Sequence, residues 1–144
     1  PLTISYEIDP CDVMKARELA YGAGYEKAPF EDLESIAQGI QGQKGHVHIH
    51  FGTPLNQPSL SVPDAVSLID DAMVANYRLF KTNFWACEAL GHTIDESERD
   101  AAEASITQSA FFARFDELSE AERQQALEMY ARPVLNVMAS KNKV

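Results

Sequence analysis

Long uninterrupted hydrophobic runs are missing from this chain. The longest stretch with a helical pattern runs roughly from residue 63 to residue 90. It is interrupted by charged side chains, among them Asp70, Asp71, Arg78, Lys81 and Glu88. Because a membrane-spanning helix needs about 20 nearly uninterrupted apolar residues, this stretch predicts a helix in contact with water.

Basic residues are scarce. The 144-residue chain has 12 lysines and arginines against 22 aspartates and glutamates, which gives a formal net charge of −10. Nucleic acids and anionic lipids are both bound by basic surfaces. The composition therefore argues against a nucleic-acid partner. If the protein works at a membrane, another segment must supply the positive surface.

Cysteine is rare, since only Cys11 and Cys87 occur. Nothing in their spacing demands a disulfide, and we interpret both as small buried hydrophobic residues of a reducing compartment. Cys11 falls at a predicted helix start, where a thiol pKa can be lowered. No partner base lies near it in the sequence, so a nucleophilic role is not expected.

Familiar catalytic motifs are absent as well. The sequence contains no Gly-x-Ser-x-Gly, no phosphate-binding loop and no Gly-x-Gly-x-x-Gly. Its carboxylates gather at predicted helix starts and solvated faces, as in Glu31-Asp32 and Asp70-Asp71. None stands alone in apolar sequence, where a raised pKa would favour acid–base catalysis. No catalytic residue is therefore predicted.

The first part of the chain, residues 1–58, has the pattern strand–helix–helix–strand. Alternating residues at 2–7 and 46–51 predict the strands. A helix is predicted from Pro10 to about Tyr21, and a second short one opens at Pro29. Two isolated strands are not stable alone, so they either pair with each other on the helices or belong to a larger sheet upstream.

The second part, residues 61–144, predicts an antiparallel three-helix arrangement. The helices are expected at about 63–90, about 95–115 and after Ser119. Thr93 with Glu96 and Ser119 with Glu122 have the spacing of capping boxes, and Pro133 is expected to kink or break the last helix. The predicted fold class is therefore α/β but mostly helical, with two short strands.

Three histidines alternate along the second strand, at His46, His48 and His50. They share one face, and neighbours lie about 6.5–7 Å apart, close enough for two of them to bind one zinc. The outer two are roughly 13 Å apart. His92 falls at a helix end with no visible partner for a third ligand. We interpret the histidines as a polar strand face, with a metal-dependent hydrolase as an alternative.

Aromatic residues are frequent in the helical part. They are Phe84, Trp85, Phe111, Phe112, Phe115 and Tyr130. We interpret them as core between helices. The alternative is an exposed patch that docks onto a catalytic domain, a second copy or acyl chains.

Two strand motifs occur in a fixed order, Pro1-Leu-Thr-Ile-Ser-Tyr-Glu7 and Gly45-x-Val-x-Ile-x-Phe-Gly-x-Pro-Leu55. The first resembles the fourth block of the glycerol-3-phosphate and lysophosphatidate acyltransferases, a proline-led apolar strand ending in Tyr-Glu or Tyr-Asp. The second is similar to the strand that closes the same domain. Residues 9–40 between them look like a subgroup of bacterial members. The resemblance covers roughly residues 1–55.

The resemblance implies transfer of a fatty acyl group from a coenzyme A or carrier-protein thioester to a glycerol phosphate in phospholipid synthesis. No further cofactor is implied. In that family a His, oriented by an Asp after four intervening residues, acts as general base, and a Glu-Gly-Thr-type block binds phosphate. Both precede the fourth block, and neither occurs here. We therefore expect the C-terminal part of an acyltransferase, inactive without its upstream catalytic half.

The resemblance carries over only Tyr6 and Glu7, as strand-end residues near the acyl or acceptor site. Lys15, Arg17 and Lys44 are the nearby cations that can meet a phosphate, although no motif of the family places them there. These five residues are the expected substrate-binding positions. No catalytic residue and no metal ligand is expected.

The rest of the chain is expected to be a family-specific helical extension at residues 61–144, after the end of the acyltransferase-like core at residues 1–58. A homodimer through the helical part is a further expectation. The family implies a cytoplasmic protein, peripheral to the inner face of a membrane. The alternative function is a helical protein-interaction module without catalysis, in which residues 1–51 form a small hairpin-like cap.

Overall fold

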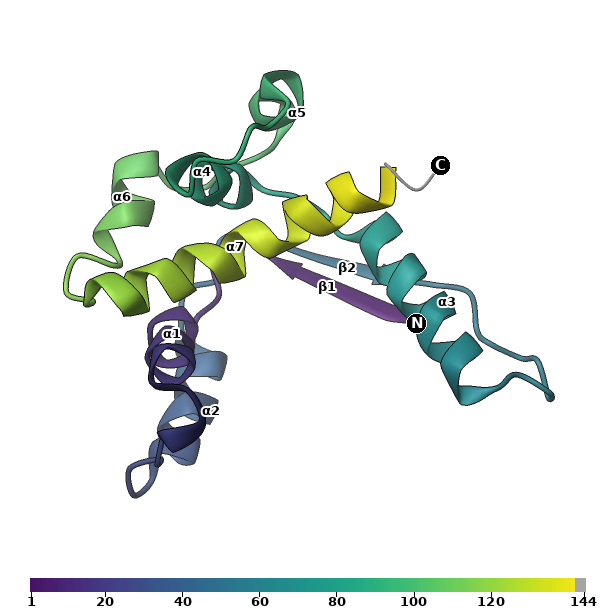
Figure 1. Cartoon of the computed structure of the whole chain (residues 1–144), viewed down its shortest axis with the longest axis horizontal. Helices are drawn as coiled ribbons and strands as arrows, with labels where there is room; N and C mark the ends of the chain where they lie inside the picture. The colour runs from purple at the N-terminus through teal and green to yellow at the C-terminus, as the bar shows by residue number, and fades with distance from the viewer. Residues whose placement is uncertain (142–144) are drawn as a thin grey trace.

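The computed structural model describes residues 1–141 of the chain. That range is mostly helical, with one two-stranded sheet (Figure 1). The strands are β1 (Leu2–Tyr6) and β2 (Val47–Phe51). The helices are α1 (Asp12–Tyr21), the short 3-10 helix η1 (Gly22–Gly24), α2 (Glu31–Gln41), α3 (Val62–Asn76), α4 (Lys81–Ala89), α5 (Glu96–Ala101), α6 (Gln108–Ala113) and α7 (Glu120–Lys141).

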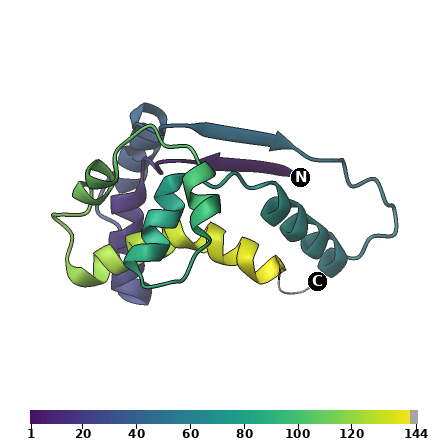
Figure 2. The same ribbon diagram turned by 90° about the horizontal axis from the view of Figure 1, so that it is seen from above.

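The two predicted strands pair with each other. β1 and β2 run antiparallel, with Leu2 opposite Phe51 and Tyr6 opposite Val47. In Figure 2, β1 lies between β2 and the helices α3 and α7, so β2 forms the outer rim of the sheet. The position of the sheet therefore leaves β2 remote from the helical core.

The helices predicted between the strands are confirmed. α1 begins at Asp12, two residues later than expected, and ends at Tyr21, directly before Gly22, whose φ of 72° suits glycine. α2 begins at Glu31 after Phe30, which has a left-handed φ of 70°. Both helices end within a few residues of the positions that the periodicity predicts.

Residues 61–141, the described range of the second part, contain five helices rather than the three that the sequence predicts. The expected helix at 63–90 divides into α3 and α4, because the backbone is extended at Tyr77 and Phe80. Lys81 N donates a hydrogen bond to Glu103 O at 3.0 Å, and Asn83 Oδ1 accepts one from Phe80 N at 2.8 Å. These tertiary and capping contacts replace the helical bonds of the junction.

The expected helix at 95–115 also divides, into α5 and α6. Asp95 caps α5 through its side chain, so the predicted capping box at Thr93 is wrong. The capping box at Ser119 is confirmed, because Ser119 and Glu122 exchange backbone-to-side-chain hydrogen bonds of 2.8 and 3.4 Å. α7 continues through Pro133 without a break.

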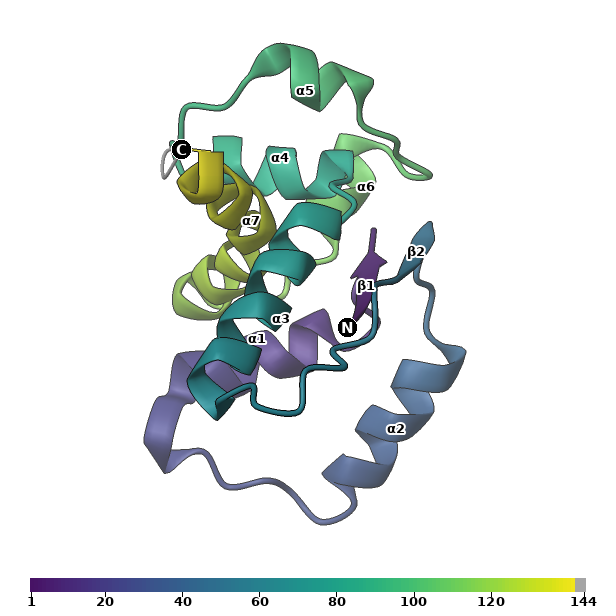
Figure 3. The same cartoon turned by 90° about the vertical axis from the view of Figure 1, so that its right-hand side faces the viewer.

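The hydrophobic core lies where α7 crosses α4 and α1 (Figures 1 and 3). Phe111 is fully buried and meets Phe115 and Tyr130 edge-on, with ring centroids 5.3 and 4.9 Å apart. The predicted aromatic core between helices is therefore confirmed, with Phe112 only partly buried at its margin.

No helix within residues 1–141 combines the length and the apolar character that crossing a membrane requires. Cys87 is buried in α4 and Cys11 is partly buried, and both thiols are free. The interpretation of the cysteines as small apolar residues agrees with this burial for Cys87. Burial also raises the pKa of the Cys87 thiol to about 11.

Candidate functional site

The sheet packs against the helices with its polar face. Thr3, Ser5 and Glu7 are buried, with no more than 1% of their surface exposed. The neighbours Leu2 and Ile4 are 50% and 40% exposed. Antiparallel sheets usually bury the apolar face and leave the polar one to water. The alternation runs the opposite way here, so the face toward the helices is held by hydrogen bonds.

Those hydrogen bonds reach the junction between α3 and α4. Ser5 Oγ accepts a hydrogen bond from Arg78 N at 2.9 Å. Thr82 Oγ1 donates one to Glu7 O at 2.8 Å in a buried position. The hydrogen bonds of Ser5 and Thr82 thus connect β1, and Glu7 directly after it, to the α3–α4 junction.

Glu7 is the centre of this polar face. Its Oε2 accepts hydrogen bonds from Ser105 Oγ at 2.7 Å and from His46 N at 2.8 Å, and His46 Nδ1 lies 2.9 Å away. Its Oε1 accepts from Ser105 N. Gly45 packs so closely that a side chain there would collide with the Glu7 carboxylate. The carboxylate is therefore enclosed by donors from two distant segments.

The pKa of Glu7 reflects both its burial and these bonds. Burial acts to raise the pKa, but the hydrogen bonds from Ser105 and from the His46 backbone outweigh it and lower the pKa below the ordinary value. Glu7 is therefore ionised at neutral pH and fully occupied by protein donors. Glu7 is a predicted substrate-binding residue, but its side chain is buried and closed to solvent in this chain.

His46 is the most accessible titratable group of this cluster. Its ring stacks on Phe80 with centroids 6.0 Å apart, and 47% of its side chain is exposed. A carboxylate on Nδ1 is the arrangement that orients a general base in acyl-transfer triads. Ser105 Oγ, however, bonds to the same carboxylate as His46. The three side chains therefore do not form the nucleophile–base–carboxylate order of a triad.

The other histidines of β2 lie on the same face as His46. Within residues 1–141, no group of three or more histidine, cysteine or acidic side chains is arranged to hold a metal ion. The row of histidines therefore has no third metal ligand within residues 1–141. The alternative of a metal-dependent hydrolase has no metal site in that range.

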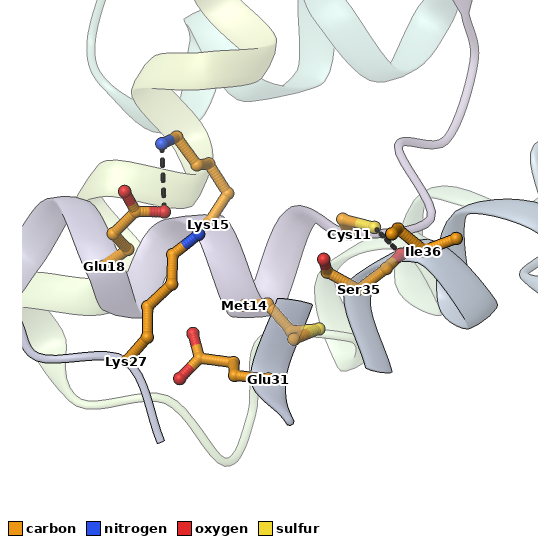
Figure 4. A pocket seen from close by; sticks show the side chains of 8 residues that line it. All are labelled: Cys11, Met14, Lys15, Glu18, Lys27, Glu31, Ser35 and Ile36. Carbon is orange, nitrogen blue, oxygen red and sulfur yellow. Dashed lines mark hydrogen bonds and ion pairs between the residues drawn. The ribbon is translucent and has the colours of Figure 1, made fainter. Parts of the chain in front are cut away.

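A pocket of about 280 Å³ separates α1 from α2 (Figure 4). Lys15 and Lys27 line it, and each is already paired: Lys15 Nζ lies 3.0 Å from Glu18 Oε2, and Lys27 Nζ lies 2.6 Å from Asp32 Oδ1. Glu31 adds a further negative charge at the wall. The three carboxylates outnumber the two lysines, so the pocket has no cationic surplus for a phosphate.

Cys11 lies in the same pocket and donates a hydrogen bond from Sγ to Ser35 O at 3.4 Å (Figure 4). Burial and the nearby carboxylates of Asp9 and Asp12 raise the pKa of its thiol. A raised pKa reduces the thiolate fraction at neutral pH. The local chemistry is therefore that of an unreactive thiol.

The remaining predicted site residues have separate partners. Tyr6 lines a different pocket, of about 130 Å³, with Tyr77 and Tyr130. Arg17 Nε lies 3.8 Å from a carboxylate of α7, and Lys44 Nζ donates to two backbone oxygens at the end of α2, at 2.9 and 3.2 Å. The three predicted cations, Lys15, Arg17 and Lys44, therefore each have different partners.

Sequence reasoning missed the ion pair between the buried Asp12 and the partly exposed Arg114. Arg114 Nη2 lies 2.7 Å from Asp12 Oδ2, which also accepts a hydrogen bond from the Tyr130 hydroxyl at 2.8 Å. Burial and the Asp12 charge raise the pKa of Tyr130. Residues more than a hundred positions apart form this contact, and no local pattern signals it. It joins α1 to α7 and to the end of α6.

The apolar surface left open is extensive. On the sheet, Val47, Ile49 and Phe51 are exposed together with Leu2 and Ile4. Further large exposed side chains lie on and before α2 and along α3: Phe30, Leu33, Ile36, Ile40, Val62, Val66, Leu68 and Met73. The exposed side chains of the sheet share one face, and contiguous apolar surface of that kind marks a site of interaction in soluble proteins.

Comparison of the chain with protein-family models, with curated proteins and with solved structures finds no match.

Proposed function

We propose that this chain is the C-terminal part of a glycerolipid acyltransferase. The whole protein moves a fatty acyl group from an acyl-coenzyme A or acyl-carrier-protein thioester to a glycerol phosphate. The catalytic His and Asp belong to the half that precedes Pro1, and residues 1–144 alone transfer no acyl group. The protein works in the cytoplasm, peripheral to the inner face of a membrane.

The observation that carries this proposal is the pairing of the two motif strands. The segments that resemble the family's closing strands are far apart in sequence, yet they lie side by side in one sheet. Their apolar residues face each other across the strands, as in the pair Ile4 and Ile49. That apolar face points away from this chain's own core, as expected for the end of a larger sheet that another layer covers.

The edges of the sheet support the same proposal. Glu7 N donates to His46 O at 2.9 Å, and Gly52 N donates to Pro1 O at 2.8 Å. Because hydrogen-bonded and non-hydrogen-bonded pairs alternate in antiparallel sheets, the backbone groups of residues 2, 4 and 6 and of residues 47, 49 and 51 point outward. Within residues 1–141 no backbone or side-chain group is bonded to those outward amides. The outer edge of β2 can therefore accept a further strand, whereas α3 lies beside the edge of β1.

The surroundings of the cations are relevant to where the phosphate binds. Lys15 is paired with a carboxylate, and Lys44 is bonded to backbone oxygens. Given the net charge of −10, we assign phosphate binding and membrane contact to the preceding half. Tyr6 is then the last residue of β1, and Glu7 follows it. The buried carboxylate of Glu7 holds the end of the strand in position.

The experiment begins with the coding sequence upstream of Pro1. We expect a His and an Asp separated by four residues within roughly 150 residues, about one domain. The longer protein, purified and given labelled acyl-coenzyme A, is expected to acylate glycerol 3-phosphate or lysophosphatidate. Residues 1–144 alone and a His→Ala variant of the longer protein are expected to give no product.

A matched pair of variants links the assay to the sheet. In the longer protein, Ile49→Asp on the open face is expected to reduce transfer strongly, whereas Val62→Asp at the start of α3 retains it. Absence of the His and Asp pair, or no acyl transfer to either acceptor, would overturn the proposal.

A second candidate is a helical interaction module without catalysis. It is favoured by the location of the hydrophobic core, which lies mostly in α4, α6 and α7, whereas the first part of the chain adds the buried residues Ile8 and Ala16, with Val13 packed against the core. This candidate predicts that residues 61–144 fold alone. Circular dichroism of that segment tests it, and an unfolded segment excludes it.

A further inference from the structure

A small cavity opens where the end of β1 meets the middle of α7 (Figure 1). It measures about 130 Å³. The residues that line it come from β1, the segment after it, the end of α3, α4 and α7: Tyr6, Asp9, Tyr77, Asn83, Met129 and Tyr130. The cavity therefore combines three tyrosine side chains with a single carboxylate.

Asn83 and Tyr130 form the buried wall of this cavity, since neither is more than 5% exposed. The Asn83 amide donates to Tyr130 O at 2.9 Å and accepts from Phe80 N at 2.8 Å. The Tyr130 hydroxyl donates to Asp12 Oδ2 and accepts from Asp9 N. The polar groups of this wall are thus bonded within the protein. A ligand meets mainly the four lining residues that are only partly buried.

Asp9 supplies the negative charge of the cavity. Its Oδ1 accepts a hydrogen bond from Cys11 N at 2.8 Å, and no basic side chain within residues 1–141 forms an ion pair with it. Arg114 reaches Asp9 O at 3.4 Å, but its charge is paired with Asp12. Burial raises the pKa of Tyr77, and the charge of Asp9 raises it further. The carboxylate therefore acts on the tyrosines without a cation of its own.

These features select a methylated ammonium group over other cations. Aromatic rings attract cations through their faces, and sites of this composition recognise quaternary ammonium ligands. Calcium and magnesium need several oxygen ligands, whereas one carboxylate lines this cavity. The rings and Met129 offer apolar contact to methyl groups, which a strongly hydrated lysine ammonium lacks. The volume is that of about four water molecules, at about 30 Å³ each, which suits a compact headgroup.

We propose that this cavity binds a quaternary ammonium group of the choline type, with Asp9 as its counter-ion and Tyr6 and Tyr77 as its aromatic contacts. The methyl groups lie against the rings and Met129, and the positive charge lies near the carboxylate. This inference does not depend on acyl transfer.

Isothermal titration calorimetry of the whole chain with choline, at about 0.15 M salt to screen long-range attraction, tests the proposal. Saturable binding at one site is expected. The uncharged analogue of choline, in which a carbon atom replaces the nitrogen, has the same shape and is expected to bind at least about tenfold more weakly, because it lacks the attraction of a cation to the rings. No saturable binding of choline, or equal binding of the analogue, would overturn the proposal.

Variants test whether the ligand lies in this cavity. Tyr77→Leu removes the ring and is expected to weaken choline binding about tenfold, whereas Tyr77→Phe keeps the ring and binds as the unaltered chain does. Asp9→Asn keeps an acceptor for Cys11 N and is also expected to weaken binding about tenfold. Asp116→Asn removes the same charge from an exposed position and is the matched control. Unchanged binding by Tyr77→Leu or by Asp9→Asn would overturn the proposal.

A second ligand distinguishes a lipid headgroup from a free ammonium compound. Arg132 lines an adjoining cavity of about 250 Å³, which shares Tyr77 and Met129 with the first. If the source is a lipid headgroup, glycerophosphocholine binds more tightly than choline, and Arg132→Gln removes the difference. If the source is a free ammonium compound, choline binds at least as tightly. The acyl-transfer assay of the longer protein is separate from these titrations, so the two proposals fail separately.

Discussion

The two faces of the small sheet differ in both chemistry and surroundings. The polar face is closed along β1, because Ser5 and Glu7 are buried and bonded to the α3–α4 junction, to α4 and to the α5–α6 connection. The apolar face is open, and Phe51 on it is 81% exposed. The comparison shows that hydropathy alone does not decide which face of a strand is packed. The closed face contributes to the stability of this chain, whereas the open face remains available to a partner.

The largest expected effect distinguishes the closed core from the open face. Phe111→Ala is expected to lower the free energy of unfolding by about 4 kcal/mol, because it leaves a cavity among buried rings. Phe51→Ala is expected to lower it by about 0.5 kcal/mol or less, as for exposed positions. Urea unfolding followed by circular dichroism measures both. Equal losses would remove the distinction between the two regions.

The next effect concerns the closed face itself. Glu7→Gln is expected to lower the free energy of unfolding by about 3 kcal/mol, because an amide cannot accept all the hydrogen bonds that the carboxylate accepts. Glu103→Gln, on a more exposed carboxylate paired with Arg78 at 3.2 Å, is the matched control with an expected loss below about 1 kcal/mol.

The pH dependence of Glu7 sharpens the same comparison. Since its pKa is lowered in the folded chain, its contribution is complete above the unfolded pKa of about 4.3 and is lost as the pH falls through the folded pKa. Unfolding measured from pH 6 to pH 3 should therefore narrow the gap between the unaltered chain and Glu7→Gln. A constant gap would mean that the carboxylate is not stabilised by folding.

A smaller effect is expected where α1 meets α7. The Tyr130 hydroxyl donates to Asp12 Oδ2 and accepts from Asp9 N at 2.9 Å. Tyr130→Phe removes both bonds and is expected to lower the free energy of unfolding by about 1–2 kcal/mol. Tyr21→Phe, at a tyrosine that is 71% exposed, should leave it unchanged. Thermal and urea unfolding measure both variants. Equal free energies of unfolding for the two variants would contradict the role given to the Tyr130 hydrogen bonds.

The smallest effect is expected on the open face. Ile49→Thr keeps a β-branched side chain and should change the free energy of unfolding by less than about 0.5 kcal/mol. The same substitution should reduce retention on a hydrophobic column, because it removes exposed apolar surface. A loss above about 1.5 kcal/mol in urea unfolding would show that Ile49 is packed within this chain.

Much of the fold could be predicted from local patterns. The strands, α1, α2, α7 and the aromatic core all follow from periodicity and from helix-start signals such as Ser119 with Glu122. The division between α3 and α4 could not, because Phe80 continues the helical stripe in sequence. Only its contacts with Asn83 and with the Glu103 segment show the extended backbone.

The candidate site was less accessible to prediction. Alternation on β1 defines two faces, but it does not say which one is packed. The Glu7 cluster joins residues 98 positions apart at Ser105, and the Asp12 pair with Arg114 is similarly distant. The resemblance predicts Glu7 as a strand-end residue near the acyl or acceptor site. Its role as a buried anchor depends on tertiary contacts that no local signal contains.

The most direct test is amide hydrogen exchange of the chain on its own. The outward amides of Val47, Ile49 and Phe51 should exchange quickly, while the inward amides of Ser5 and Glu7 should be protected. Protection of the outward amides to the same degree would contradict the central claim. It would show that the rim of the sheet is already covered in this chain and needs no further strand or partner.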